Sequence, residues 1–128
     1  MSGATFDPTP APLLVACLCA GWCTACQAYA PVFAAVAKQF PDVPFAWVDI
    51  EEHSDALGEA ALDIEDFPTL MLLRGDGAAF YGTVLPHPGT LTRMVEALRD
   101  GGALAVGQPC PAGFAAAVRR VGALALLQ

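Results

Sequence analysis

The chain has 128 residues, a length that suits a single domain with a substantial core. Hydrophobic residues make up 55% and charged residues 15%, which argues against a disordered chain. Thirteen acidic and six basic residues give a net charge of −7, and residues 1–37 contain no Lys or Arg. We therefore expect no nucleic-acid partner, no secretory signal, no membrane association and a cytoplasmic location.

The first third of the chain predicts a leader, a strand and a helix. Residues 1–12 carry three prolines and no periodicity, which indicates a flexible leader. Residues 13–19 form a continuous apolar run of strand length, as expected for a strand covered on both faces. From residue 23 to residue 40, apolar residues recur at steps of three and four, which predicts a helix with Pro31 as a kink inside it.

The middle of the chain adds a strand, a short helix and a hairpin. Residues 45–49 predict a second strand, and residues 53–62 a short helix after it. Residues 69–74 and 78–84 read as two strands joined by a turn at 75–77, which has the sequence Gly-Asp-Gly. Three acidic residues at and just after the end of the second strand, Asp49, Glu51 and Glu52, are interpreted as a solvated strand end.

The last third of the sequence predicts two helices, the first amphipathic and the second largely apolar. Residues 90–99 place four apolar side chains on one side of a helix that Gly101 and Gly102 end. A connector with Gly and Pro follows, and the apolar run from 114 to 127 predicts a final helix. We expect a domain over 13–99, with residues 100–128 as a connector and a helix packed on it. The order of elements favours an α/β fold around a central mixed β-sheet.

Four of the five cysteines lie within ten residues, at Cys17, Cys19, Cys23 and Cys26. Cys23-Thr24-Ala25-Cys26 follows a buried strand and opens a helix, whose unpaired N–H groups favour a thiolate on the first cysteine. A thiolate attacks a disulfide to give a mixed disulfide, which a second thiol one turn further on can resolve. In a reducing compartment, clustered cysteines indicate redox chemistry or metal binding more than structural disulfides.

Three further features give the chain a family resemblance. "GWCTAC" places a tryptophan before the cysteine pair, Pro31 follows Cys23 by eight residues, and "DFPTLMLL" places Pro-Thr before a hairpin. Over about residues 13–99 the chain resembles the thioredoxin family. The resemblance implies a thioredoxin-like fold, with a central mixed β-sheet flanked by helices. It also implies that the N-terminal βα unit is reduced and that the C-terminal helix is an addition, which we expect to cover the sheet edge left open.

The resemblance also implies a function and the residues that perform it. The chain would be a thiol–disulfide oxidoreductase acting on protein disulfides, with a separate electron donor, no bound cofactor and no metal, and it would be a monomer. Cys23 would attack and Cys26 would resolve. The implied supporting residues are Trp22, which shields the pair, and Phe67, Pro68 and Thr69, where a cis Phe67–Pro68 bond and the Phe67 main chain hold the substrate.

The chain departs from the family pattern at several positions. Thr24-Ala25 replaces both the Gly-Pro of reductive thioredoxins and the X-His of oxidants and isomerases, so the direction of electron flow stays open. Cys17 stands where the family has a buried carboxylate, and Trp47 where it has the lysine partner. A proton acceptor for Cys26 is then missing unless Cys17 or a water replaces it, and we expect slower resolution of mixed disulfides.

The roles of Cys17, Cys19 and Cys110 stay open between several alternatives. Cys17 and Cys19 are two apart on a strand and share a face. They read first as small buried apolar residues, second as accessory thiols, and third as two ligands of a four-thiolate zinc or iron–sulfur site. Cys110, between two prolines, reads as a bystander. A thioredoxin-fold scaffold without catalytic activity is the rival of a different class.

Overall fold

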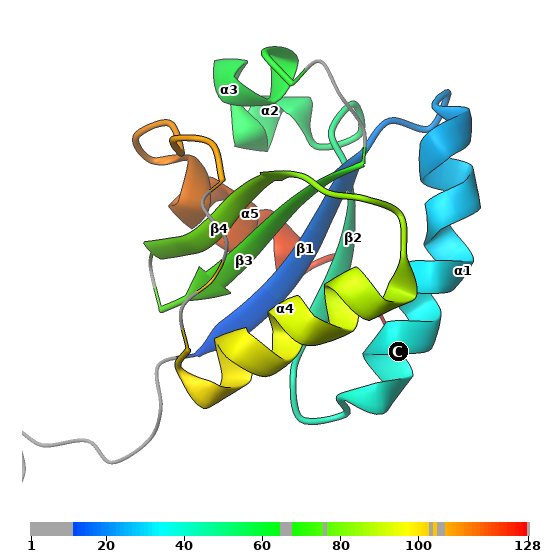
Figure 1. Cartoon of the computed structure of the whole chain (residues 1–128). Helices are drawn as coiled ribbons and strands as arrows, with labels where there is room; N and C mark the ends of the chain where they lie inside the picture. The colour runs from blue at the N-terminus through cyan, green and yellow to red at the C-terminus, as the bar shows by residue number, and fades with distance from the viewer. Residues whose placement is uncertain (1–11, 65–67, 76, 103, 105–106, 128) are drawn as a thin grey trace, which may run out of the picture.

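The centre of the fold is a four-stranded mixed sheet in the order β2-β1-β3-β4 (Figure 1). A computed structural model describes residues 12–64, 68–75, 77–102, 104 and 107–127. β1 pairs with β2 in parallel and with β3 antiparallel, and β3 pairs antiparallel with β4, so the predicted α/β fold with a mixed sheet is confirmed. The strands are β1 (Leu13–Cys19), β2 (Phe45–Asp49), β3 (Thr69–Arg74) and β4 (Gly77–Thr83).

Helices cover both faces of this sheet (Figure 1). They are α1 (Thr24–Gln39), α2 (Ser54–Leu57), α3 (Glu59–Leu62), α4 (Pro88–Asp100) and α5 (Phe114–Gly122). The single helix predicted over 53–62 is divided, because Gly58 between α2 and α3 has φ 78°, a left-handed value that a helix cannot continue through. Among the described residues, no helix is long and apolar enough to span a membrane.

The two faces of β1 belong to two separate parts of the core. Successive side chains on a strand point to opposite faces. Val15, Cys17 and Cys19 therefore lie in the cluster that α1 and α4 cover, whereas Leu14 and Leu18 lie in the cluster under α2, α3 and α5. This explains why the sequence of β1 is apolar throughout, as predicted for a strand covered on both faces.

The C-terminal segment lies along the edge of β2. After α5 ends at Gly122, Leu126 forms an antiparallel bridge with Ala46. The Trp47 N–H donates to the Ala125 carbonyl at 3.2 Å, and the Leu127 N–H donates to the Phe45 carbonyl at 2.8 Å. The predicted helix to residue 127 is thus too long, because its last residues pair with a strand edge whose backbone groups need partners.

The leader predicted at 1–12 lies, except for Pro12, outside the described residues, as does any reduced N-terminal βα unit within it. The domain limits at 13 and 99 stay a prediction. The Pro12 carbonyl accepts a hydrogen bond from the Gly75 N–H at 2.8 Å and another from the Arg119 guanidinium at 2.9 Å. These contacts attach the start of β1 to the β3–β4 turn and to α5.

Candidate redox site

The connection from β1 to α1 exposes one tryptophan and one cysteine. The Cys23 N–H donates to the Ala20 carbonyl at 3.0 Å, which turns the chain sharply after β1. Cys23 is the N-cap of α1 in an extended conformation, and its carbonyl accepts the Gln27 N–H at 3.2 Å. The Gln27 side chain donates to the Gly21 carbonyl at 3.1 Å. The loop is therefore fixed at both ends, with Trp22 66% exposed and Cys23 partly exposed.

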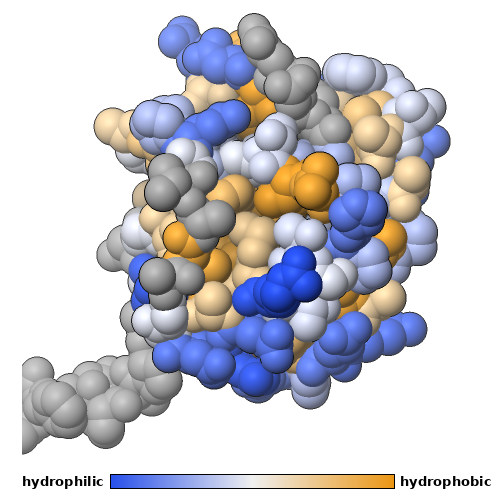
Figure 2. Space-filling model, in the orientation of Figure 1, coloured by the Kyte–Doolittle hydropathy of each residue, from blue (hydrophilic) through white to orange (hydrophobic). Residues whose placement is uncertain are grey.

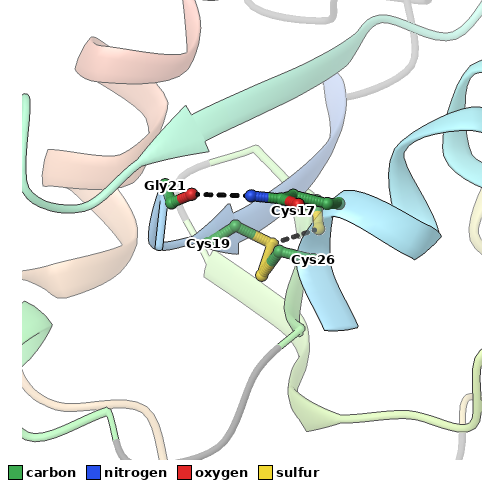
Figure 3. Close-up of a disulfide and its surroundings, with 5 residues drawn as sticks. Cys17, Cys19, Gly21 and Cys26 are labelled. Carbon is green, nitrogen blue, oxygen red and sulfur yellow. Dashed lines mark hydrogen bonds between the residues drawn. A yellow bond between two sulfur atoms is a disulfide. The ribbon is translucent and has the colours of Figure 1, made fainter. Parts of the chain in front are cut away.

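A disulfide joins Cys19 at the end of β1 to Cys26 in the first turn of α1 (Figure 3). Their Cα atoms are 5.9 Å apart, and both residues are only 2% exposed. Cys23 is a free thiol. The structure thus differs from the Cys23–Cys26 pairing that the resemblance implies, and Cys19 is more than a buried apolar neighbour. The reason is positional, because Cys19 and Cys26 both point into the layer between β1 and α1.

Cys17 lies behind this disulfide and is fully buried (Figure 3). Its sulfur is 3.5 Å from the Cys19 sulfur, and its register partner on β2 is Trp47. Burial raises the pKa of the Cys17 thiol far above its ordinary value, so this thiol stays protonated. Burial also raises the pKa of Tyr29, and the nearby Cys17 raises it further. Cys17 is therefore an uncharged group in contact with the disulfide.

A small cavity opens beside the disulfide. It has a volume of about 150 Å³, and its lining includes Cys19, Cys26, Trp47 and Asp49. Asp49 is the register partner of Cys19 on the parallel strand β2. Its Oδ1 accepts the N–H groups of the next two acidic residues, at 2.9 and 3.2 Å. The sequence predicts a solvated strand end here, whereas the parallel register of β1 and β2 places Asp49 in the lining of the cavity beside the sulfurs.

The predicted substrate-binding residues lie partly within the described chain. Pro68 and Thr69 are both buried at the start of β3. Because Leu18 is the register partner of Thr69, the antiparallel pairing brings Pro68 to the end of β1, next to Cys19. Phe67 lies outside the described residues, so the predicted cis bond stays a prediction.

Comparison with known proteins now identifies the family. The thioredoxin family model matches residues 8–87. The chain belongs to the thioredoxin family. An H-type thioredoxin of Picea mariana is 37% identical over 79 residues, which cover 62% of this chain and 61% of that protein. Thioredoxin H4-2 of Oryza sativa subsp. japonica is 29% identical over 91 residues, which cover 70% of this chain and 65% of that protein.

Solved structures agree with this fold. A wild-type thioredoxin h from poplar matches with a TM-score of 0.59 at 26% identity, covering 70% of this chain and 78% of that chain. The Drosophila melanogaster thioredoxin Deadhead matches with a TM-score of 0.58 at 18% identity, covering 68% of this chain and 81% of that chain, which supports the fold alone. The chain spans less than two thirds of the length of the two curated thioredoxins named above.

The cysteines of this thioredoxin-family chain do not form a metal site among the described residues. No group of three or more His, Cys, Asp or Glu residues is arranged there to hold a metal ion. Cys19 and Cys26 are bonded to each other, and Cys110 lies with the core cluster on the opposite face of the sheet. Burial raises the pKa of Cys110, and a hydrogen bond with the Ala115 backbone partly offsets this.

A larger groove lies between β4 and α4, where Figure 2 shows hydrophobic side chains gathered on the surface. Its volume is about 630 Å³, and Phe80, Val84, Leu85 and Met94 are among its lining residues. The described residues that line it include no cysteine. Among the described residues, the groove is therefore separate from the cysteines of this thioredoxin-family protein.

Proposed function

We propose that this protein is a thiol–disulfide oxidoreductase that exchanges disulfides with protein substrates through Cys23 and Cys26. It works as a monomer in the cytoplasm, without a bound cofactor, and receives electrons from a separate donor. Membership of the thioredoxin family supports this proposal. The observation that carries it is the position of the two cysteines, since Cys23 is a partly exposed thiol at the N-cap of α1 and Cys26 lies in the first turn of the same helix.

The chemistry follows from the position of Cys23 at the start of α1. Its thiolate attacks a substrate disulfide and forms a mixed disulfide, while the helix N-terminus favours the negative charge. Cys26 then attacks the Cys23 sulfur and releases the substrate as a dithiol. Trp22 directly precedes Cys23 in the chain and is proposed to shield the pair, and the Phe67 main chain is proposed to pair with an extended substrate peptide as an added strand.

Reduction of insulin disulfides, with dithiothreitol as electron donor, tests this function. We expect Cys23→Ser to lower the rate to the uncatalysed background, because no other partly exposed thiol lies at the start of α1 in the described chain. Cys26→Ser should accumulate the mixed disulfide. Cys110→Ser is the matched control and should keep the wild-type rate, since Cys110 lies on the other face of the sheet.

The rival scaffold function makes the opposite prediction. A wild-type rate at the background level, with partner binding in cells retained by Cys23→Ser, would mean that the domain binds without catalysis. For an active protein, equilibration in graded thiol buffers gives the direction of electron flow. A midpoint near about −270 mV would indicate a reductase, and one above about −200 mV an oxidant or isomerase.

A further inference from the structure

The oxidised chain hides its disulfide and leaves a thiol at the surface. Cys19 and Cys26 are almost fully buried, whereas Cys23, between them in sequence, is partly exposed and free. A two-cysteine thioredoxin mechanism ends with both Cys23 and Cys26 oxidised. The observed pairing therefore needs a thiol that is not part of that mechanism.

Cys26 has one cysteine neighbour on each side. Cys19 approaches it from the end of β1, with 5.9 Å between the Cα atoms. Cys23 precedes it by three residues as the N-cap of α1, which is the Cys-x-x-Cys spacing of a thiol pair that can form a disulfide. Cys26 is thus bonded to Cys19 in the structure and has Cys23 as its second cysteine neighbour along the chain.

We propose that Cys19 is a third redox thiol, which takes the disulfide over from Cys23 after each substrate is reduced. This inference rests on the proposed function. Once the Cys23–Cys26 disulfide has formed, the Cys19 thiolate attacks the Cys26 sulfur. The Cys19–Cys26 bond forms, the Cys23–Cys26 bond breaks, and Cys23 leaves as a thiolate that takes up the proton given by Cys19. No electrons enter or leave in this step, since one disulfide and one thiol are present before and after it.

Two features of the site fit this role. The cavity of about 150 Å³ lined by Cys19, Cys26 and Asp49 is large enough to admit water, which gives the buried thiols a route for protons. Behind Cys19, the Cys17 sulfur is 3.5 Å away, but Cys17 is not among the residues that line this cavity and its thiol is fully buried, which makes it a poor nucleophile. Cys19 therefore keeps the disulfide with Cys26, and no further exchange with Cys17 follows. The oxidised protein keeps Cys23 available for another exchange reaction and protects its disulfide from bulk reductants.

A disulfide map of the full chain tests this directly. The reduced protein is oxidised with one equivalent of diamide, quenched in acid, denatured, alkylated with N-ethylmaleimide and analysed by mass spectrometry. Because residues 1–37 contain no Lys or Arg, trypsin leaves all four clustered cysteines in one peptide. Chymotrypsin cleavage after Trp22 separates Cys19 from Cys23 and Cys26. A Cys19–Cys26 bond then links two peptides, whereas a Cys23–Cys26 bond lies within one.

We expect linked peptides with the alkyl label on Cys23. Unlinked peptides with the label on Cys19 would overturn the proposal. In Cys19→Ala the disulfide should move to Cys23–Cys26, and labelling of Cys23 should fall by at least about tenfold. Cys17→Ala is the matched control on the same face of β1 and should keep the linked peptides. If circular dichroism shows that Cys19→Ala is unfolded, the wild-type map alone decides.

The outcomes separate this inference from the proposed function. Catalysed insulin reduction together with a Cys23–Cys26 bond in the wild-type map would overturn only the role of Cys19. An insulin reduction rate at background would overturn the proposed function and, with it, the exchange step that rests on it.

Discussion

The two faces of β1 have the same burial but different chemistry. On one face, Cys17 and Cys19 lie under α1, and one of them is bonded to that helix. On the other face, Leu14 and Leu18 pack in the cluster that contains the residues of α5, and the contacts there are apolar. One strand thus holds a buried disulfide on one face and an apolar packing surface on the other. Substitutions on the two faces should therefore have separable effects.

The largest expected effect is on stability, at the α5 face. Phe114 is 2% exposed and packs edge-on against Tyr81, with ring centroids 5.7 Å apart. Phe114→Ala should lower the free energy of unfolding by about 3–5 kcal/mol, because it leaves a cavity in the core. Urea unfolding followed by circular dichroism measures this. At a temperature where the variant is folded, its disulfide map should match the wild type, and a changed map would show that the two faces are coupled.

The next largest effect is a loss of stability expected at the edge of β2. Leu127→Pro removes the N–H that donates to the Phe45 carbonyl and should cost about 1–3 kcal/mol of unfolding free energy. Because an unpaired strand edge can pair with another chain, size-exclusion chromatography should also show larger species. Leu127→Ala keeps the N–H and is the control. Equal losses in the two variants would mean that the side chain, and not the backbone bond, holds this segment.

Two buried groups between β1 and α1 should make the stability of the protein sensitive to alkaline pH. The pKa values of Cys17 and Tyr29 are raised in the folded protein, so their stabilising contribution is complete below the unfolded pKa values and is lost as pH rises above them. Above about pH 8.5, the unfolding free energy should begin to fall, by up to about 1.4 kcal/mol per pH unit for each group. Urea titrations between pH 7 and pH 11 measure the slope. Cys17→Ala should reduce it, and an unchanged slope would exclude Cys17 as the cause.

The smallest effect is expected at the Tyr29 hydroxyl. This oxygen is buried and has no hydrogen-bond partner among the described residues. Tyr29→Phe should raise the free energy of unfolding by about 1 kcal/mol at neutral pH, because it removes an unsatisfied polar group while keeping the ring contact with Phe33. A loss of stability of similar size would show that the hydroxyl is hydrogen-bonded in solution.

Much of the local structure could be predicted, since it depends on short-range patterns. The limits of β1, β2 and β3 agree with the predicted strands because a continuous or alternating apolar run is bounded by Gly, Pro or charged residues. α1 was also predicted to within a residue at each end. The C-terminal helix was predicted too long, because residues 123–127 are apolar enough for a helix but pair with β2 instead.

The sequence by itself determined the cysteine cluster, the helix that begins beside it and the family resemblance, because these depend on residue types at fixed spacing. Only the tertiary structure decided that Cys26 pairs with Cys19, since a strand end and a helix turn seven residues apart must meet in space. The same holds for Asp49, which lines the cavity beside the sulfurs because of the parallel register of β1 and β2. Spacing along the chain sets which groups are available, and packing of the elements sets which of them touch.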